Sequence, residues 1–302
     1  MKTEGKVCVS VAIALLLLEG AARLLEPHLS RDVEEMLARS SIPDRIEEHR
    51  ETGGFAVLVI GNSLARANIH RETFESQLAA KGYQNPAIFF LTADGTNINE
   101  WNASYRKYFA GGTAKPDWIV WVTGPGHLVD QPPSSPERLA AYHSAVSDMP
   151  IALGEWLTET NSRARFLLAW CSRLFACRER VRPLLFYNFV PGFEATSEAI
   201  NQREKSQRKN PEPGNGRASR FMSALESAGI PGQRMFVIAA ALPSSYQLPD
   251  AVKEVAKREG VAVFESGAKR KWGADAFPDG YHLSEARSID FTRGAVAEMP
   301  LP

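Results

Sequence analysis

The residues best suited to chemistry lie near the two ends of the chain: Ser63 near the start, and Asp279 with His282 near the end. A serine hydroxyl is a weak nucleophile until a nearby base takes its proton, and that base needs an acceptor that holds it in one tautomer. Asp279 and His282 are three residues apart, so the carboxylate can orient the imidazole while the other ring nitrogen faces the serine. Together the three side chains predict nucleophilic acyl chemistry.

The element that must present Ser63 is a strand. Phe55 to Ile60 are apolar or β-branched and are bounded by Gly53-Gly54 and Gly61, which is typical of a parallel strand covered on both faces. Ligands of open α/β sheets bind at the carboxyl ends of the strands, so a serine directly after the first strand is well placed. A plain tight turn into a helix gives the same short pattern, and it is the late Asp/His pair that favours a catalytic serine.

The turn Gly61-Asn62-Ser63 and the late segment Asp279-Gly280-Tyr281-His282-Leu283 together resemble the SGNH (GDSL-like) hydrolase superfamily. That superfamily opens with Gly-Asp-Ser and closes with Asp-x-x-His, in the same order and at similar spacing. The resemblance covers residues 53–302 and implies a catalytic triad of Ser63, His282 and Asp279. Asn62 stands where the family has Asp, which is a mild departure because the nucleophile itself is retained.

The resemblance also implies an oxyanion hole, and here the match is uneven. Gly95 follows an apolar segment and takes the position of the glycine whose backbone N–H would join that of the nucleophile; a simple turn glycine is the alternative. The third block, Gly-x-Asn-Asp, falls on residues 124–127 and puts Gly126 where the donor Asn is expected. Loss of one such donor costs about 10²- to 10³-fold in turnover. Asn97 and Asn99 lie close enough in sequence to Gly95 to be proposed as substitutes.

Strands and helices alternate along most of the chain, which indicates a parallel sheet. The predicted fold is a three-layer α/β/α sandwich of the SGNH type, preceded by an N-terminal membrane helix and carrying a helical insertion at about 137–215. After the first strand, helices are expected at 71–81, 101–109, 221–228, 249–259 and 285–298, and strands at 89–92, 118–123, 235–242 and 261–264.

The N-terminus contains two lysines followed by an apolar run from Val7 to Leu18. This run is shorter than the roughly 20 residues that span a bilayer, but it extends to Leu25 with Glu19 and Arg23 near its outer end. An uncleaved anchor over 1–28 is favoured; a cleaved signal peptide and a buried helix of a soluble protein are the alternatives. The positive-inside bias of the lysines places the catalytic domain extracytoplasmic, in the bacterial periplasm, or secreted if the segment is cleaved.

Two further segments are predicted to have supporting roles. Residues 29–52 are charged and helix-like, which indicates a juxtamembrane stalk without chemistry. Within the insertion, residues 163–182 interleave aromatic and aliphatic residues with arginines. This is typical of core packing, and the alternative is an amphipathic cap over the site or against the membrane surface. Cys171 and Cys177 would point to different sides of one helix, so no disulfide is expected.

The composition excludes several classes of function. The 302-residue chain has 35 basic and 35 acidic residues, so it offers no case for a nucleic-acid partner. The six histidines lack paired ligand spacing and the three cysteines form no framework, so neither a metal nor another cofactor is expected. With 44% hydrophobic residues, the chain is long enough for one domain with a sizeable core.

Two functional hypotheses follow. The first is a serine-dependent esterase or O-acyltransferase that acts outside the cytoplasm on an acylated carbohydrate or small ester. Resemblance to membrane-anchored members that modify envelope polysaccharides implies an acetyl or similar group on a cell-envelope glycan. The second is a non-catalytic or weakly active envelope protein that binds a glycan or an assembly partner, motivated by Gly126 and Asn62. The acyl group, its acceptor and the choice between hydrolysis and transfer stay open.

Overall fold

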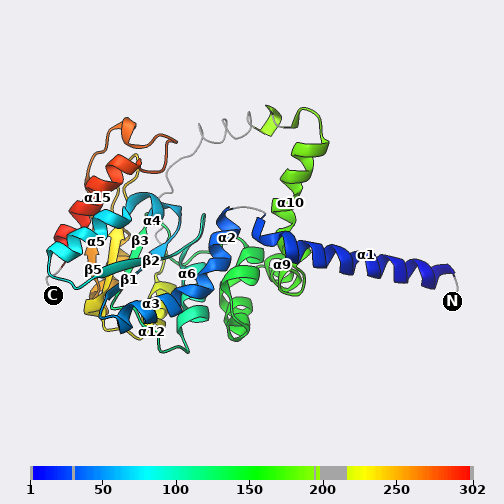
Figure 1. Ribbon diagram of the computed structural model, residues 1–302, viewed down its shortest axis with the longest axis horizontal. Helices are drawn as coiled ribbons and strands as arrows, with labels where there is room; N and C mark the ends of the chain where they lie inside the picture. The colour runs from blue at the N-terminus through cyan, green and yellow to red at the C-terminus, as the bar shows by residue number, and fades with distance from the viewer. Residues whose placement is uncertain (1–2, 29–30, 194, 198–215, 300–302) are drawn as a thin grey trace.

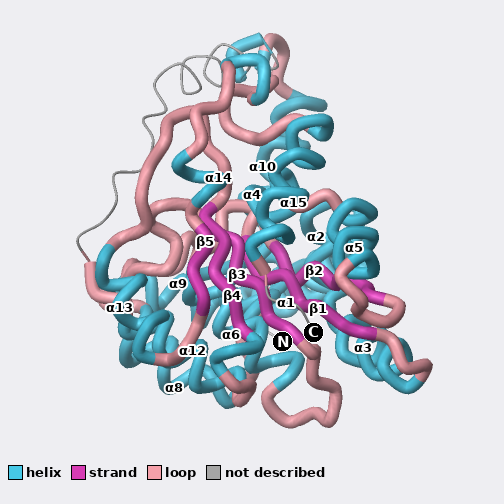
Figure 2. Tube along the Cα trace, turned by 90° about the vertical axis from the view of Figure 1, so that its left-hand side faces the viewer, coloured by secondary structure: helices cyan, strands magenta, loops and turns pink. Residues whose placement is uncertain are grey.

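A five-stranded parallel sheet forms the centre of the molecule in the computed structural model, which describes all residues except 1–2, 29–30, 194, 198–215 and 300–302 (Figure 1). Figure 2 shows the strands side by side, in the order β2-β1-β3-β4-β5. Every pairing is parallel, which confirms the predicted sheet. The strands are β1 Phe55–Gly61, β2 Pro86–Thr92, β3 Trp118–Thr123, β4 Met235–Ala239 and β5 Ala262–Phe264.

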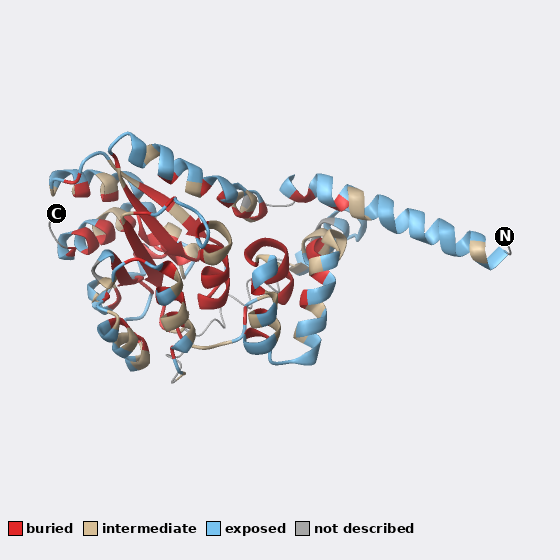
Figure 3. Cartoon of the chain, turned by 90° about the horizontal axis from the view of Figure 1, so that it is seen from below, coloured by how far each residue is buried: buried red, intermediate tan, exposed pale blue. Residues whose placement is uncertain are grey.

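Helices cover both faces of the sheet, so the predicted three-layer sandwich is confirmed. The central strands are buried because each face is packed against a helical layer, and the fully buried residues concentrate there (Figure 3). One layer contains α3 Ile42–Glu51, α6 Ile98–Phe109, α12 Ser219–Ala228 and α13 Asp250–Arg258. The other contains α4 Ser63–Asn68, α5 Arg71–Ala80 and α15 Glu285–Glu298. Shorter pieces are α14 Ser266–Lys269 and single turns at Glu26–His28, Arg39–Ser41, Val146–Asp148, Gly232–Arg234 and Ala274–Ala276.

The N-terminal helix α1 Thr3–Leu25 projects away from the domain and is almost wholly exposed (Figures 1 and 3). The stretch Thr3–His28 has a mean hydropathy of 2.0 and is long and apolar enough to cross a membrane, as an anchor or as a signal sequence. At its base, the Glu19 carboxylate accepts hydrogen bonds from the Ser172 hydroxyl at 2.8 Å and the backbone N–H of Arg173 at 2.8 Å. The base of α1 is therefore tied to the folded domain.

The segment predicted as a stalk is packed onto the domain, so that expectation is wrong. It forms α2 Arg31–Ala38, the turn Arg39–Ser41 and α3, which we call the arm. Apolar arm residues are buried because the helices are amphipathic, and Asp32 on α2 pairs with Arg138 and Arg180 at 2.9 Å each. The buried arm residues are Val33, Met36, Ile42 and Ile46.

The described part of the insertion is helical, as predicted, and the rest of its expected range lies outside the described residues. It comprises α7 Pro136–Arg138, α8 Met149–Ile151, π-helical turns at Leu139–His143 and Ala152–Trp156, α9 Thr160–Cys171 and α10 Arg173–Phe189. The expected single helical run over 163–182 is instead two helices. The chain turns at Ser172, whose hydroxyl accepts the N–H of Phe175 and caps α10.

Contacts of α9 and α10 support the core-packing interpretation for part of this run, since Leu167 and Leu168 are exposed. Phe166 and Cys177 are fully buried, and Phe166 belongs to a third core cluster that joins the insertion to α2 and α6. Its arginines meet carboxylates of the protein: Arg165 pairs with Glu137 at 2.6 Å, and Arg178 contacts the same carboxylate. Both cysteines of the run are free, Cys171 exposed and Cys177 buried.

Candidate active site

The sheet topology defines where a site would form. Strand β1 is flanked by β2 on one side and by β3 on the other. The chain leaves β1 toward β2 and leaves β3 toward β4, so the loops after these two adjacent strands run in opposite directions along the sheet. Such a switch point leaves a crevice at the carboxyl edge of the sheet. Ser63 directly follows β1, and residues 124–127 directly follow β3. Both segments singled out from the sequence therefore meet at this edge.

The backbone around Ser63 is fixed from both sides. Asn62 caps α4, because its side-chain oxygen accepts the N–H of Leu64 at 3.0 Å, and Ser63 is the first helical residue. The Asn62 amide nitrogen donates to the carbonyl of Thr96 at 3.1 Å and joins this turn to the loop after β2. At Gly61, a Cβ would lie 2.7 Å from the carbonyl oxygen of Val122, so only glycine allows β1 and β3 to approach here.

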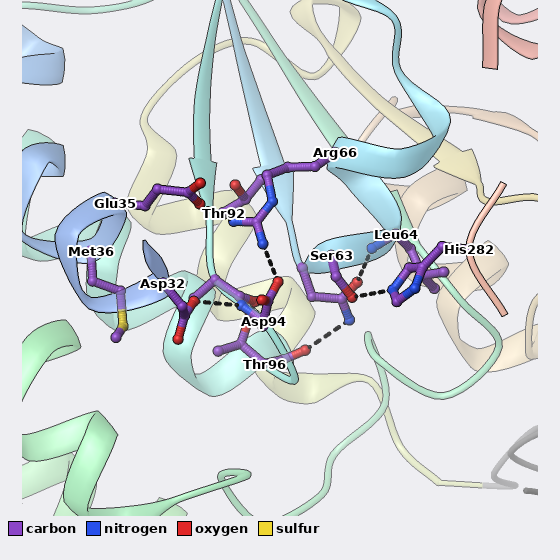
Figure 4. A network of polar contacts seen from close by, with 12 residues as sticks. Asp32, Glu35, Met36, Ser63, Leu64, Arg66, Thr92, Asp94, Thr96 and His282 are labelled. Carbon is purple, nitrogen blue, oxygen red and sulfur yellow. Dashed lines mark hydrogen bonds and ion pairs between the residues drawn. The ribbon is translucent and has the colours of Figure 1, made fainter. Parts of the chain in front are cut away.

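Ser63 forms one chain of hydrogen bonds with His282 and Asp279 from the far end of the sequence. The Ser63 Oγ lies 2.9 Å from His282 Nε2 (Figure 4). His282 Nδ1 lies 2.6 Å from Asp279 Oδ2. The other carboxylate oxygen of Asp279 accepts the backbone N–H of His282 at 2.7 Å and of Tyr281 at 2.9 Å. Gly280 has φ of +78° in the tight turn between the carboxylate and the imidazole. The structure thus brings together the serine, histidine and aspartate singled out in the sequence.

The electrostatics of this chain favour an ionised aspartate. Burial disfavours the charged form of Asp279, but the hydrogen bonds from His282 and Tyr281 outweigh it and lower the pKa of the carboxyl to about 2. An ionised carboxylate keeps the proton of the neutral ring on Nδ1, so Nε2 can accept from the serine hydroxyl. The side chains of His282 and Asp279 are 33% and 45% exposed, so the site opens to solvent.

Gly95 and Gly126 lie in the turns that flank this chain. Gly95 has φ of +61° in the loop after β2, next to the Thr96 carbonyl that receives the Asn62 bond. Gly126 lies in the turn after β3, where a Cβ would meet open space, and its carbonyl accepts from Gln131 at 2.8 Å. The Gly95 turn is therefore tied to the Ser63 turn, whereas Gly126 contributes no side-chain donor.

The contacts of Asn97 and Asn99 do not support the prediction that either side chain replaces the missing donor, because both have other partners. Asn97 caps α6, and its amide nitrogen donates to the carbonyl of Pro132 at 2.9 Å. The amide nitrogen of the fully buried Asn99 donates to Asn97 Oδ1 and to the Gln131 carbonyl, both at 2.7 Å. With both amide hydrogens engaged, Asn99 holds a loop and cannot donate to an oxyanion.

Sequence reasoning gave no role to His127, which packs behind the Ser63 turn. Its Nδ1 accepts the N–H of Gly124 at 3.0 Å, and its Nε2 lies 3.3 Å from the amide nitrogen of Asn62. Burial lowers the pKa of His127 to about 4, so the ring is neutral at ordinary pH. The sequence feature that could have indicated this role is its position directly after Gly126, within the third block. His127 supports the loop on which the Ser63 turn rests.

A second serine–histidine pair lies in the interior. The Ser104 hydroxyl on α6 is 2.7 Å from Nδ1 of His143, and the two residues are 2% and 1% exposed. Burial first, and then the positive charges of Arg39, Arg138 and Lys107, hold the pKa of His143 well below its usual range.

Across the described ranges, no group of three histidine, cysteine or carboxylate side chains could hold a metal ion.

Comparison with known proteins finds one distant structural likeness and no similar sequence. No protein-family model matches the sequence, and no curated protein is similar to it at a significant level. Among solved structures, the chain is similar to the crystal structure of the lipase/acylhydrolase from Enterococcus faecalis. The two are 11% identical with a TM-score of 0.39, over 82% of this chain and 98% of that one. A likeness this distant says nothing of activity.

Proposed function

We propose that the protein is a serine-dependent esterase or O-acyltransferase. The observation that carries the proposal is the unbroken hydrogen-bond chain from Ser63 through His282 to Asp279 at the solvent-open carboxyl edge of the sheet. A nucleophile, a base and an orienting carboxylate in contact are what acyl transfer through a covalent intermediate requires.

In the first half of the reaction, Ser63 Oγ attacks the acyl carbonyl carbon while His282 Nε2 takes the hydroxyl proton. Asp279 stabilises the imidazolium that forms, and its low pKa keeps it ionised throughout. The proton then passes from Nε2 to the leaving alcohol oxygen as the ester bond breaks, which leaves an acyl-serine. Water or a sugar hydroxyl attacks that ester, again with His282 as base, and releases the acyl group as an acid or a new ester.

The backbone N–H groups of Ser63 and Gly95 are the proposed donors to the oxyanion. The bond from Asn62 to Thr96, which ties the two turns together, supports this pairing. Each preorganised donor contributes about 10²- to 10³-fold to turnover in comparable sites. With Gly126 in place of a donor side chain, we expect slower turnover than that of a site with three donors.

The proposed setting is the cell envelope. Helix α1 carries Lys6 near its start and projects from the domain as a membrane anchor would, so the domain would lie outside the cytoplasm. An acylated, most simply acetylated, envelope glycan is the substrate class that this location favours.

The second candidate function is a binding protein that retains the fold with little or no turnover. Gly126 and the fully engaged Asn99 favour it, because neither supplies the third oxyanion donor. Such a protein would hold a glycan or an assembly partner at the same edge of the sheet.

A fluorophosphonate probe separates the two candidates, because it reacts with a serine only when a base activates the hydroxyl. Full-length protein in detergent is incubated with the probe, and its intact mass is measured. We expect one adduct on the wild type, none on Ser63→Ala, and an unchanged adduct on Ser104→Ala, the matched control from the buried pair. A wild type that stays unlabelled favours the binding protein, and an adduct that persists on Ser63→Ala means that the nucleophile is another residue.

A further inference from the structure

A cavity of about 410 Å³ lies between the arm and the outer edge of β2, close to the Ser63 turn. The arm contributes Arg39 and Arg45 to its wall, and the α4–α5 segment contributes Arg66 and Arg71. Glu35 is the one carboxylate among the described residues that line it. The wall therefore gathers four guanidinium groups around one space.

Arg39 is the most unusual of these groups, because it is buried and forms no ion pair with a carboxylate in the described part of the chain, although the charge of Asp32 acts on it. It is 3% exposed and donates to the carbonyl of Thr92, while its Nε has no hydrogen-bond partner among the described residues. The nearby carboxylate of Asp32 is engaged by Arg138 and Arg180. A buried cation without a paired anion is costly, so the fold holds a positive charge at this wall that a bound anion would compensate.

Arg45 also has no carboxylate at ion-pair distance in the described part of the chain, and its guanidinium lies over the ring of Phe89 at 5.5 Å. Arg71 covers Phe90 at 5.1 Å and lies 3.5 Å from Glu75. These two arginines are exposed at the mouth of the cavity, whereas Arg39 lies in its wall. An entering anion would thus meet solvated arginines first and the buried one last.

The cavity adjoins the proposed catalytic serine. Arg66 follows Ser63 by three residues on α4, which sets their Cβ atoms about 5–6 Å apart. Thr92, which receives the Arg39 bond, pairs with Gly61 across β1 and β2. The Arg66 side chain reaches the carboxylates of Glu35 and Asp94, and Asp94 directly precedes Gly95 (Figure 4). An anion held in the cavity would therefore lie on the Arg66 side of the Ser63 turn.

We propose that this arginine cavity binds an anionic oxygen group, a phosphate or a carboxylate, carried by the ester substrate of Ser63. Guanidinium forks match both groups, because their paired N–H bonds fit two oxygens of one anion. The inference rests on the proposed esterase function, and it narrows the substrate to acyl esters that carry a negative charge near the scissile bond.

Anion binding is tested without catalysis, on full-length Ser63→Ala protein in detergent. Inorganic phosphate and glucuronate are titrated separately by calorimetry at constant ionic strength, which distinguishes the phosphate from the carboxylate. We expect saturable binding of at least one anion, weakened about 10- to 100-fold by Arg39→Met, because bonds to charged groups are among the strongest. Arg45→Met should weaken it about 2- to 5-fold, as for an exposed ion pair. The control Arg293→Met, on the exposed face of α15, should leave it unchanged.

Arg39→Met also separates loss of the anion site from loss of the fold. Methionine fills a similar buried space without a charge, so the variant should melt at or above the wild-type temperature in the absence of anions. The anion that binds should raise the melting temperature of the parent and leave that of Arg39→Met unchanged. Absence of saturable binding, or binding that neither Arg39→Met nor Arg45→Met weakens, would overturn the anion site.

A kinetic arm links the site to the substrate and uses the active protein. Arg45→Met should raise the ratio of KM for an O-acetylated glucuronate to KM for neutral 4-nitrophenyl acetate about 2- to 5-fold. An unchanged ratio, with anion binding lost, would show that the cavity serves a ligand other than the substrate and would overturn the proposal. Absence of turnover of either ester would count against the proposed esterase function, while the calorimetry would still decide whether the anion site exists.

Discussion

Among the residues that the structure describes, two serine–histidine hydrogen bonds of nearly equal length lie in very different settings. Ser63 and His282 meet at 2.9 Å on the open carboxyl edge of the sheet. Ser104 and His143 meet at 2.7 Å between α6 and the insertion, with almost no exposed surface. The shorter contact is the less suitable one for chemistry, because no substrate carbonyl could reach it. Distance alone is therefore a poor sign of an activated serine.

The environment of the second ring nitrogen separates the two pairs further. His282 has the ionised Asp279 at 2.6 Å, which can stabilise an imidazolium. In the described part of the chain, the Nε2 of His143 has no hydrogen-bond partner, and the charges that act on its ring come from Arg39, Arg138 and Lys107. A proton accepted by His143 would have to coexist with three cations in a buried space. The first pair thus has the geometry that the proposed mechanism needs, whereas the second is a buried structural contact.

Removal of the proposed base His282 should give the largest effect on turnover. His282→Ala should lower turnover of a small neutral ester such as 4-nitrophenyl acetate by about 10³- to 10⁶-fold, because Ser63 then has no proton acceptor. Adding Ser63→Ala should cost little more, since the two groups act as a unit. The measurement is kcat of the purified variants against their uncatalysed background. A double variant much slower than either single one would mean that the two residues act separately.

Removal of the carboxylate charge tests the feature that only one pair has. Asp279→Asn keeps the shape of the turn, but its amide can favour the wrong imidazole tautomer, so turnover should fall about 10³- to 10⁴-fold, as in serine proteases. The melting temperature should change little, because the side chain is 45% exposed. Circular dichroism during heating, combined with kcat, checks both parts. A loss below tenfold would remove Asp279 from the proposed mechanism.

The same contrast explains which parts could be predicted from sequence. Ser63 follows a continuous apolar strand, and Asp279 and His282 lie three residues apart in one turn, so local pattern was enough to single them out. That both ends meet follows from a general property of parallel sheets, whose strand ends share one edge. Strands β1 and β3 and helix α15 were located well because their apolar patterns are long and bounded by turns or caps.

The parts that were missed depend on contacts between distant residues. The arm looked like a solvated stalk because its charges are visible in sequence, whereas their partners are 106 residues away at Arg138 and 148 away at Arg180. Asn99 is close to Gly95 in sequence, but α6 turns it toward Arg220, 121 residues away. The sequence around a residue does not indicate a partner that is far away along the chain. The buried Ser104–His143 pair, 39 residues apart, was missed for the same reason.

A third prediction concerns pH and sharpens the difference between the two histidines. The pKa of His143 lies well below 6.5 in the folded state, so the unfolded chain binds the extra proton as pH falls below about 6.5, and stability declines. The full effect of one such group is about 1.4 kcal/mol per pH unit. In His143→Asn, an amide oxygen can accept from Ser104 without titrating. We expect a weaker loss of stability from pH 7 to pH 5 in this variant, measured by urea unfolding. Parallel curves for wild type and variant would contradict the assignment.

The smallest expected effects are those on stability when each serine is replaced, and the two variants should show opposite patterns of stability and turnover. Ser104→Ala leaves Nδ1 of the buried His143 without its hydrogen bond, at a cost of about 1–3 kcal/mol, partly offset by the better helix propensity of alanine on α6. The net loss in free energy of unfolding should be about 1 kcal/mol, with ester turnover retained. Ser63→Ala should do the opposite and abolish turnover with stability within about 0.5 kcal/mol of the wild type, because the partly exposed site lets water replace the hydroxyl. Urea unfolding gives the stability of each variant, and kcat measured on the same preparations gives its turnover. If Ser104→Ala lost activity at full stability, the buried pair would have a role in the reaction that its isolation from solvent argues against.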